Sequence, residues 1–202
     1  NGVQSEGVGA CPKHYVANDS EDFRFHYDVQ LDNQTLHELY LKPFQIACEA
    51  KPWTIMSAYN SVQGFSMTES PLLTDPLKSK WEFDGAVISD WTAVRSVNES
   101  ANAAQDWVMP GPFTTWASGL KAAVENGSVP ESAIDEKVFR MLGVALRVGA
   151  LEKPSKTTSK VENIRSEIRK IAAAGMVLVK NTAQTLPLTN PGKLAVIGLH
   201  AS

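Results

Sequence analysis

Three short apolar stretches of this chain end in side chains that can do chemistry: Lys13 and His14 after the first, Tyr59 after the second, and Asp90 and Trp91 after the third. A carboxylate ringed by cations and hydrogen-bond donors is held in its charged form. Such a carboxylate suits nucleophilic attack on the anomeric carbon of a sugar. The aromatic rings offer apolar faces to sugar C–H groups, and the cations offer donors to hydroxyls. The same set would also suit an aldolase or a phosphate-handling barrel enzyme.

Each of these residues also has a simpler interpretation when it is taken alone. Asp90 can be the N-cap of a helix, because Asp is favoured at that position. His14 can be a structural hydrogen-bond partner, and Tyr59 can be a core residue. Lys13, and Arg24 in the loop after the first apolar stretch, can be solvated charges. The functional interpretation therefore depends on whether these residues converge at one place.

The expected elements alternate between strands and helices. Strands are expected at residues 7–16, 54–59, 85–90 and 104–112, and helices at 33–50, 71–83, 116–126 and 130–151. The first helix has apolar residues at helical spacing, with Asp32 and Asn33 before it as cap candidates. Continuous apolar strands separated by helices predict a parallel sheet covered by helices. Such folds place their chemistry at the carboxyl ends of the strands, where the polar residues of this chain stand.

Composition narrows the class of protein. The 202 residues are 43% hydrophobic and 20% charged, which is typical of a globular domain with a substantial core. A net charge of -3 without a basic stripe gives no reason to expect a nucleic-acid partner. No apolar run approaches the roughly 18 residues of a membrane span, so no membrane partner is expected. The glycines lack nucleotide-loop spacing and no metal-ligand motif occurs, so no cofactor and no metal are expected.

Two cysteines, Cys11 and Cys48, are too few for a disulfide framework or a zinc site. We interpret both as small buried hydrophobic residues rather than as a bridge or a nucleophile. Four glycosylation sequons begin at Asn18, Asn33, Asn98 and Asn126. Because the tripeptide is common by chance, these sequons favour a secreted, extracellular location only slightly.

The last part of the chain predicts a change of domain. Residues 153–160, KPSKTTSK, are the best linker candidate; residues 161–181 are expected to form a helix that passes into a strand, and residues 193–199 another strand. The chain starts without Met and ends on an expected strand that would usually open a domain. We therefore expect a segment of a larger protein.

Several blocks of the sequence resemble one family. GVQSEGVGACPKHYVANDSEDFR, IMSAYNSVQG, LLTDPLKSKWEFDGAVISDW and VMPGP are similar to successive blocks of the catalytic barrel of glycoside hydrolase family 3, in its β-glucosidase-like branch. RVGALEKP and AAAGMVLVKN are similar to the family's linker and the entry to its second domain. The resemblance implies an α/β fold in three parts: a partial TIM-like (β/α) barrel with parallel strands over 1–150, a linker over 151–160, and the first elements of an α/β sandwich domain over 161–202.

The same resemblance implies an activity and a partner. The activity would be that of a retaining exo-β-glycosidase of β-glucosidase type, which hydrolyses terminal non-reducing β-linked sugars through a covalent glycosyl-enzyme on Asp90. Its partners would be a β-glucoside or oligosaccharide and the remaining segments of the same enzyme, on the same or a separate chain. A β-xylosidase or arabinosidase of the same family, or a non-catalytic sugar-binding fragment, are the alternatives.

The resemblance also implies site residues: Lys13, His14 and Arg24 for the hydroxyls of the terminal sugar, Met56 for the pocket wall, Tyr59 against the nucleophile, and Trp91 for stacking beside the cleaved bond. Arg95 is a candidate to support Asp90.

The chain also departs from the family pattern. The family's general acid/base, a Glu in or after the second domain, has no counterpart here, and Glu21, Glu69 and Glu99 stand in no matching block. An Asp and an Arg that the family's early strands supply are also absent, so we expect no turnover from these 202 residues alone. Trp107 replaces the first Met of the family's Asp-Met-x-Met-Pro-Gly block, which permits a changed aglycone side. We expect Asp106, in the same block, to be structural.

Overall fold

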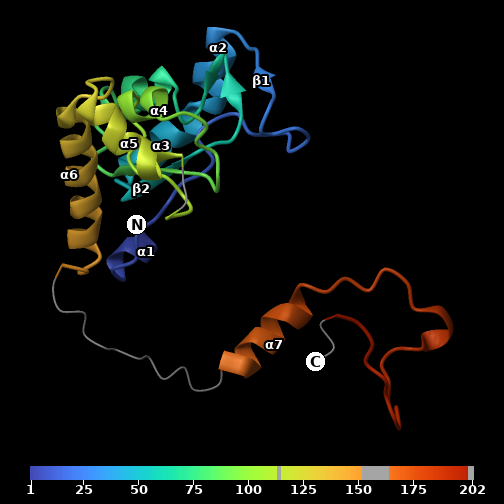
Figure 1. Ribbon diagram of the computed structural model, residues 1–202. Coiled ribbons are helices and arrows are strands. Elements are labelled where there is room, and N and C mark those ends of the chain that lie inside the picture. The colour runs from blue at the N-terminus through green and yellow to red at the C-terminus, as the bar shows by residue number, and fades with distance from the viewer. Residues whose placement is uncertain (113–114, 152–163, 200–202) are drawn as a thin grey trace. The chain divides into compact units, whose positions relative to one another are not determined.

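The computed structural model describes residues 1–112, 115–151 and 164–199 (Figure 1). These residues belong to two compact units, Asn1–Ser155 and Lys156–Ser202. The expected linker lies outside the described residues except for Leu151, so the domain boundaries remain a prediction. In the described part of the chain, no helix has both the length and the apolar character needed to cross a membrane.

Two parallel strands form the centre of the first unit. β2 (Thr54–Ser57) and β5 (Ala86–Ser89) pair in parallel, from Thr54 opposite Ala86 to Ser57 opposite Ser89. Their residues are largely apolar and β-branched, which suits a strand buried on both faces. Both strands therefore end at the same level, and Tyr59 and Asp90 follow at that edge.

An extended segment, residues 10–15, lies along the free side of β2. The amide of Met56 donates to the carbonyl of Pro12 at 3.1 Å, and the amide of Tyr15 donates to the carbonyl of Met56 at 2.8 Å. Tyr15 and Ser57 form a parallel bridge. The strand expected at 7–16 is thus present as a strand-like segment beside β2.

A second extended segment, residues 106–109, lies along the other side of β5. The amide of Ser89 donates to the carbonyl of Trp107 at 2.8 Å, and Ile88 and Trp107 form a parallel bridge. Four parallel segments therefore lie side by side in the order 10–15, β2, β5 and 106–109. This arrangement confirms an α/β fold with parallel strands.

The remaining elements of the first unit lie between and beside these segments. The helices are α1 (Gly2–Ser5), α2 (Asn33–Thr35), the π-helical turn η1 (Leu36–Tyr40), α3 (Lys42–Glu49), the 3₁₀ turn η2 (Pro71–Leu73), the π-helical turn η3 (Thr74–Lys78), α4 (Asn98–Asn102), α5 (Trp116–Glu125) and α6 (Glu131–Arg147). A small sheet in the order β1-β3-β4 is formed by Asp28–Val29, Ser61–Val62 and Phe65–Ser66.

The expected helix over 33–50 is confirmed as α2, η1 and α3 in succession. Asp32 caps it, because its carboxylate accepts the amide of Thr35 at 2.8 Å. A π-helical turn occurs where the amide of Leu41 donates to Leu36. Pro43, near the start of α3, has no N–H group to continue the ordinary bonding pattern across that point.

The helix expected over 71–83 is shorter than predicted. Only η2 and η3, from Pro71 to Lys78, are helical. Pro76 removes a backbone donor in the middle of the stretch, which limits the helix to short turns. Phe83 lies beyond it as a buried core residue. The helices expected at 116–126 and 130–151 are confirmed as α5 and α6, although α6 ends at Arg147.

The second unit contains α7 (Ile164–Ala174) and the 3₁₀ turn η4 (Thr182–Gln184). The expected helix is confirmed, but the strands expected at its end and over 193–199 are wrong for this structure. A strand needs a neighbour to take its backbone hydrogen bonds, and the described residues of this unit pair with none. Val179 and Ile197 are accordingly 90% and 92% exposed.

A buried glutamine joins three of the four parallel segments. The side chain of Gln105, fully buried, accepts a hydrogen bond from the hydroxyl of Ser57 at 2.8 Å. Its amide nitrogen donates to the carbonyls of Val87 at 3.1 Å and Trp107 at 2.9 Å. One side chain thereby fixes β2, β5 and segment 106–109 relative to each other.

The next residue, Asp106, connects the same segment to the helices. Its buried carboxylate accepts the amide of Val87 at 2.8 Å and pairs with Lys78 at 2.7 Å. Burial raises the pKa of Asp106 and lowers the pKa of Lys78, although each charge partly offsets the effect on the other. These contacts support the expected structural role of Asp106.

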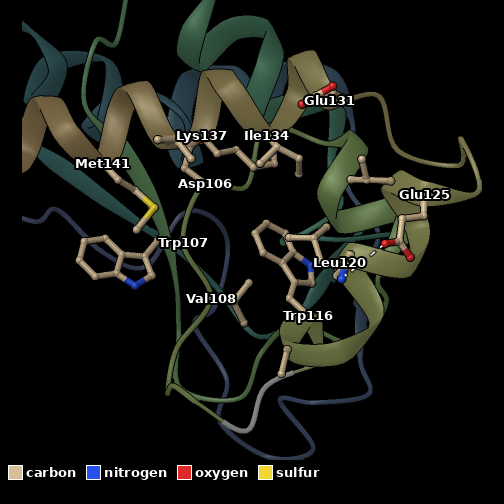
Figure 2. A pocket seen from close by; sticks show the side chains of 14 residues that line it. Asp106, Trp107, Val108, Trp116, Leu120, Glu125, Glu131, Ile134, Lys137 and Met141 are labelled. Carbon is tan, nitrogen blue, oxygen red and sulfur yellow. Dashed lines mark ion pairs between the residues drawn. The ribbon is translucent and has the colours of Figure 1, made fainter.

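Lys137 of α6 is the third buried charge in this region. Figure 2 shows its side chain beside Asp106, at the edge of a cavity of about 630 Å³ whose walls include α5, α6 and residues 106–108. Its ammonium donates to the carbonyl of Ala103 at 3.1 Å and lies 5.8 Å from the ring centroid of Trp116. Burial lowers the pKa of Lys137 to about 8.

Replacing the buried glutamine tests its part in the fold. Gln105→Leu has nearly the same size but removes three buried hydrogen bonds, to the hydroxyl of Ser57 and to the carbonyls of Val87 and Trp107. We expect the free energy of unfolding to fall by about 1–3 kcal/mol, measured as a lower urea midpoint. Gln34→Leu, at an exposed position of α2, is the matched control and should change it by less than about 0.5 kcal/mol. Equal midpoints for the two variants would contradict the role of Gln105.

The buried lysine predicts a pH dependence of stability. Its pKa of about 8 in the folded protein lies below the ordinary value of 10.5. Between these values the unfolded chain binds more protons than the folded chain, so the stability contribution of Lys137 rises with pH. The slope is at most about 1.4 kcal/mol per pH unit.

The measurement compares urea unfolding of the wild type and of Lys137→Met at pH 7.5 and 9.5. We expect the wild type to gain stability relative to the variant at the higher pH. A difference between the two proteins that does not change with pH would contradict the lowered pKa.

Candidate functional site

Asp90 lies directly after β5, at the carboxyl end of the parallel strands. Its amide donates to the carbonyl of Ser57 at 3.1 Å, and its carboxylate accepts the amide of Trp91 at 2.7 Å. The carboxylate is 12% exposed, so one face of it is open. The helix-cap interpretation is wrong, because the next helix, α4, begins only at Asn98.

His14 is the ionisable side chain that contacts the carboxylate of Asp90. Nε2 of His14 lies 3.3 Å from Oδ2 of Asp90, although 76 positions separate the two residues along the chain. The contact exists because segment 10–15 and β5 lie on opposite sides of β2 and end at the same edge. His14 and Lys13 also line a cavity of about 430 Å³. Its other walls are residues 16–19, residues 39–40 of η1 and residues 43–44 of α3.

Tyr59 completes the inner part of the site. It follows β2, is 5% exposed, and has its pKa raised, first by burial and then by the neighbouring carboxylate of Asp90. The phenol therefore stays protonated beside that carboxylate. The guanidinium of Arg95 donates to the backbone carbonyl of Tyr59 at 2.7 Å, so Arg95 supports the end of β2 rather than Asp90 itself.

Arg24 reaches the site from the loop between the first segment and β1. Its guanidinium carbon lies 4.3 Å from the ring centroid of Tyr59 and 5.3 Å from that of Phe25. The same guanidinium forms an ion pair with Glu21. Arg24 is therefore held over an aromatic face rather than extended into solvent.

Two of the expected residues are near the site without a side-chain contact to Asp90. Met56, in β2, is partly buried and stands opposite Ile88 in the strand register. The side chain of Trp91 is adjacent to the carboxylate in sequence and is 58% exposed, which leaves an indole face open. The structure thus brings together Asp90, His14, Tyr59 and Arg24 directly, whereas Lys13 shares a cavity wall with His14 alone.

The structure adds two residues that sequence reasoning did not assign. The Phe25 ring packs edge-on against Tyr59, with ring centroids 4.6 Å apart. Glu21 holds Arg24, and its spacing three residues before that arginine could have indicated the ion pair. Trp107 stands opposite Ile88 in a parallel bridge, two positions before the level of Asp90 in the strand register.

The described residues offer no metal site, since no three His, Cys, Asp or Glu side chains among them are arranged to hold an ion. The two thiols are free. Burial raises the pKa of Cys11, which is partly buried, and raises that of Cys48, in α3, to about 11. Both stay protonated at neutral pH, which agrees with the interpretation as small hydrophobic residues.

Known proteins are similar to this chain in both amino-acid sequence and fold. A β-glucosidase of Rhizobium radiobacter is 41% identical over 209 residues, which cover 100% of this chain and 25% of that protein. The thermostable β-glucosidase B of Acetivibrio thermocellus is 38% identical, over 98% of this chain and 26% of its own length. The chain therefore spans about a quarter of the length of these relatives.

Solved structures agree with this. β-Glucosidase 3B from Thermotoga neapolitana, in complex with glycerol, matches 74% of this chain and 22% of its own with a TM-score of 0.71 and 37% identity. DesR, a β-glucosidase from Streptomyces venezuelae in complex with D-glucose, matches 94% of this chain and 26% of its own with a TM-score of 0.75 and 30% identity.

The family model for the glycosyl hydrolase family 3 N terminal domain matches residues 1–144. This match covers all four parallel segments and every expected site residue. The resemblance found in the sequence motifs is thereby confirmed, and the chain belongs to glycosyl hydrolase family 3.

Proposed function

We propose that this chain is the nucleophile-bearing part of a retaining exo-β-glycosidase of β-glucosidase type. The observation that carries the proposal is the carboxylate of Asp90 at the carboxyl end of β5, 3.3 Å from His14 and beside the phenol of Tyr59. An accessible carboxylate surrounded by ordered donors is the arrangement that nucleophilic attack on an anomeric carbon requires.

In the proposed mechanism the carboxylate of Asp90 attacks the anomeric carbon of the terminal non-reducing sugar. The bond to the leaving-group oxygen breaks as the bond to Asp90 forms, and water later cleaves the glycosyl-enzyme. His14, 30% exposed, points its ring at the same carboxylate and is placed to bind a hydroxyl of that sugar. The neutral phenol of Tyr59 can donate to the nucleophile and hold it in place.

The other residues would surround the sugar. Lys13 and Arg24 supply further donors for hydroxyls, and Met56 supplies a wall of the pocket. The exposed indole of Trp91 offers a stacking face beside the cleaved bond. No cofactor takes part in this mechanism.

The general acid/base is not assigned to this chain. Retention requires two carboxyl groups about 5–5.5 Å apart. Glu21 is bound to Arg24, Glu69 accepts a hydrogen bond from Ser96 at 2.6 Å, and Glu99 is an exposed residue of the first turn of α4. We propose that the second carboxyl group comes from another part of the same enzyme, so that the 202 residues alone do not turn over substrate.

The four parallel segments would then be one part of a (β/α) barrel. Segments 10–15 and 106–109 each pair on one side only within the described residues. The outer side of each of these two segments therefore presents backbone N–H and C=O groups without a neighbouring strand in the described part of the chain. In a closed barrel, further strands would accept and donate those hydrogen bonds. We propose that the remaining strands lie in the rest of the enzyme, as its partner segments, and that residues 161–202 begin a second α/β domain.

A nucleophile variant tests the function in the full-length enzyme. Asp90→Asn keeps the shape of the side chain but removes the attacking charge. We expect the rate of hydrolysis of an aryl β-glucoside to fall at least about 1,000-fold. A slow 2-deoxy-2-fluoro glucoside should also label the wild type covalently on the peptide that contains Asp90, as mass spectrometry would show.

The matched control is Asp135→Asn, which changes an exposed carboxylate of α6 and should leave the rate unaltered. Unchanged hydrolysis by Asp90→Asn, or a label on another peptide, would overturn the proposal. The rates with aryl β-xylosides and arabinosides, measured in parallel, decide between glucose and the pentoses.

A further inference from the structure

Arg24 differs from the other proposed sugar-binding residues in how it is placed. Lys13, His14 and Tyr59 stand at or just beyond the ends of parallel segments, whereas Arg24 lies in the loop of residues 17–27, which has no helix or strand. A long arginine side chain on such a loop has many rotamers. Something other than the sheet must therefore set its direction.

Glu21 holds the guanidinium of Arg24 from one side. One carboxylate oxygen, Oε2, binds the guanidinium of Arg24, and the other, Oε1, accepts the side-chain amide of Asn18 at 3.2 Å. The backbone carbonyl of Glu21 also accepts the amide of Arg24 at 3.3 Å. Both oxygens of this carboxylate are thus committed to contacts within the loop.

Asn18 and Tyr27 extend the same chain of hydrogen bonds. The phenol of Tyr27 donates to the side-chain oxygen of Asn18 at 2.7 Å. The carbonyl of Tyr27 in turn accepts the amide of Ser61 at 3.0 Å, which ties the loop to β3. The hydrogen bonds therefore run from the small sheet, through Tyr27 and Asn18, to Glu21 and Arg24.

Aromatic rings contact the guanidinium of Arg24 on its other side. The guanidinium of Arg24 lies 4.3 Å from the ring centroid of Tyr59, and Phe25 packs edge-on against that ring. Arg24 is consequently held between a carboxylate and a π face, and the ring beneath it belongs to the residue beside Asp90.

We propose that Glu21 is a positioning residue that, with Asn18 and Tyr27, holds the guanidinium of Arg24 on the ring of Tyr59 in the orientation that binds a sugar hydroxyl. This proposal rests on the proposed function. It also excludes Glu21 as the acid/base, because its oxygens are committed to holding Arg24 and Asn18.

The proposal predicts an effect on substrate binding rather than on folding. An exposed ion pair contributes little to stability, and the side chains of Glu21 and Arg24 are 56% and 37% exposed. A pre-oriented arginine, however, loses less conformational freedom when the sugar binds. Loss of Glu21 should therefore weaken binding in the ground state and the transition state to a similar extent, which raises KM.

The test is a double-mutant cycle in the full-length enzyme, with Glu21→Ala, Arg24→Ala and the two combined. We expect Glu21→Ala to raise KM for an aryl β-glucoside about tenfold with kcat changed less than about threefold. If Glu21 acts through Arg24, the double variant should equal Arg24→Ala alone, because the two effects are coupled. Additive effects would overturn the proposal.

Two further measurements separate a positioning residue from other roles. Added azide should not restore activity to Glu21→Ala. Azide can attack a glycosyl-enzyme without help from a general base, so it rescues an enzyme that has lost that base but not one that has lost an orienting carboxylate. Formation of a glycosyl azide would overturn the proposal. Glu125→Ala removes an exposed ion pair with Lys121 of α5, in the same unit as the site, and should leave KM unchanged.

A crystal structure of Glu21→Ala gives a result that does not depend on activity. We expect the Arg24 guanidinium to leave the ring of Tyr59 while Asp90 and His14 keep their places. An arginine that stays on the ring would overturn the proposal. An enzyme that hydrolyses no β-glycoside would overturn the proposed function, but this structure would still decide whether Glu21 places Arg24.

Discussion

Parallel strands can form a site only if their ends stay level with each other, and in this chain the backbone ladder sets that condition while one buried side chain reinforces it. Gln105 bonds to β2, to β5 and to its own segment. A shift of any one of them along its axis would leave buried polar groups without partners, at a cost of about 1–3 kcal/mol each. Segment 10–15, which carries His14, is held level with them by its own backbone hydrogen bonds to β2. The 3.3 Å contact between His14 and Asp90 follows from this level edge.

The site and its support use charge in different ways. At the strand ends, Asp90 and His14 are partly open, so a ligand can reach them. Toward the helices, Asp106, Lys78 and Lys137 are almost fully enclosed. The Asp106–Lys78 pair joins segment 106–109 to η3, and Lys137 joins Ala103, which precedes that segment, to α6. Carboxylates from neighbouring segments thus have distinct roles because one faces the open edge and the other faces the helices.

The sequence was sufficient to predict those helices and strands that are indicated by the spacing of apolar residues within one short stretch. The apolar runs before Tyr59 and Asp90, and the helices around Asp32 and over α5 and α6, follow from periodicity and caps. The strands expected after α7 failed because an apolar run becomes a strand only beside a neighbour, which no single segment encodes. The placement of Arg24 could not be predicted for a similar reason, since it depends on Tyr59, 35 positions away.

The hydrogen bonds of Asn18 have a consequence for how the protein is produced. Asn18 begins one of the four sequons, and both polar atoms of its side chain are already used, by Tyr27 and by Glu21. A glycan attached there would replace one of its N–H groups and place a bulky sugar in the loop that carries Arg24. The same polypeptide made in a glycosylating and in a non-glycosylating host could therefore differ in its site, with no change of sequence.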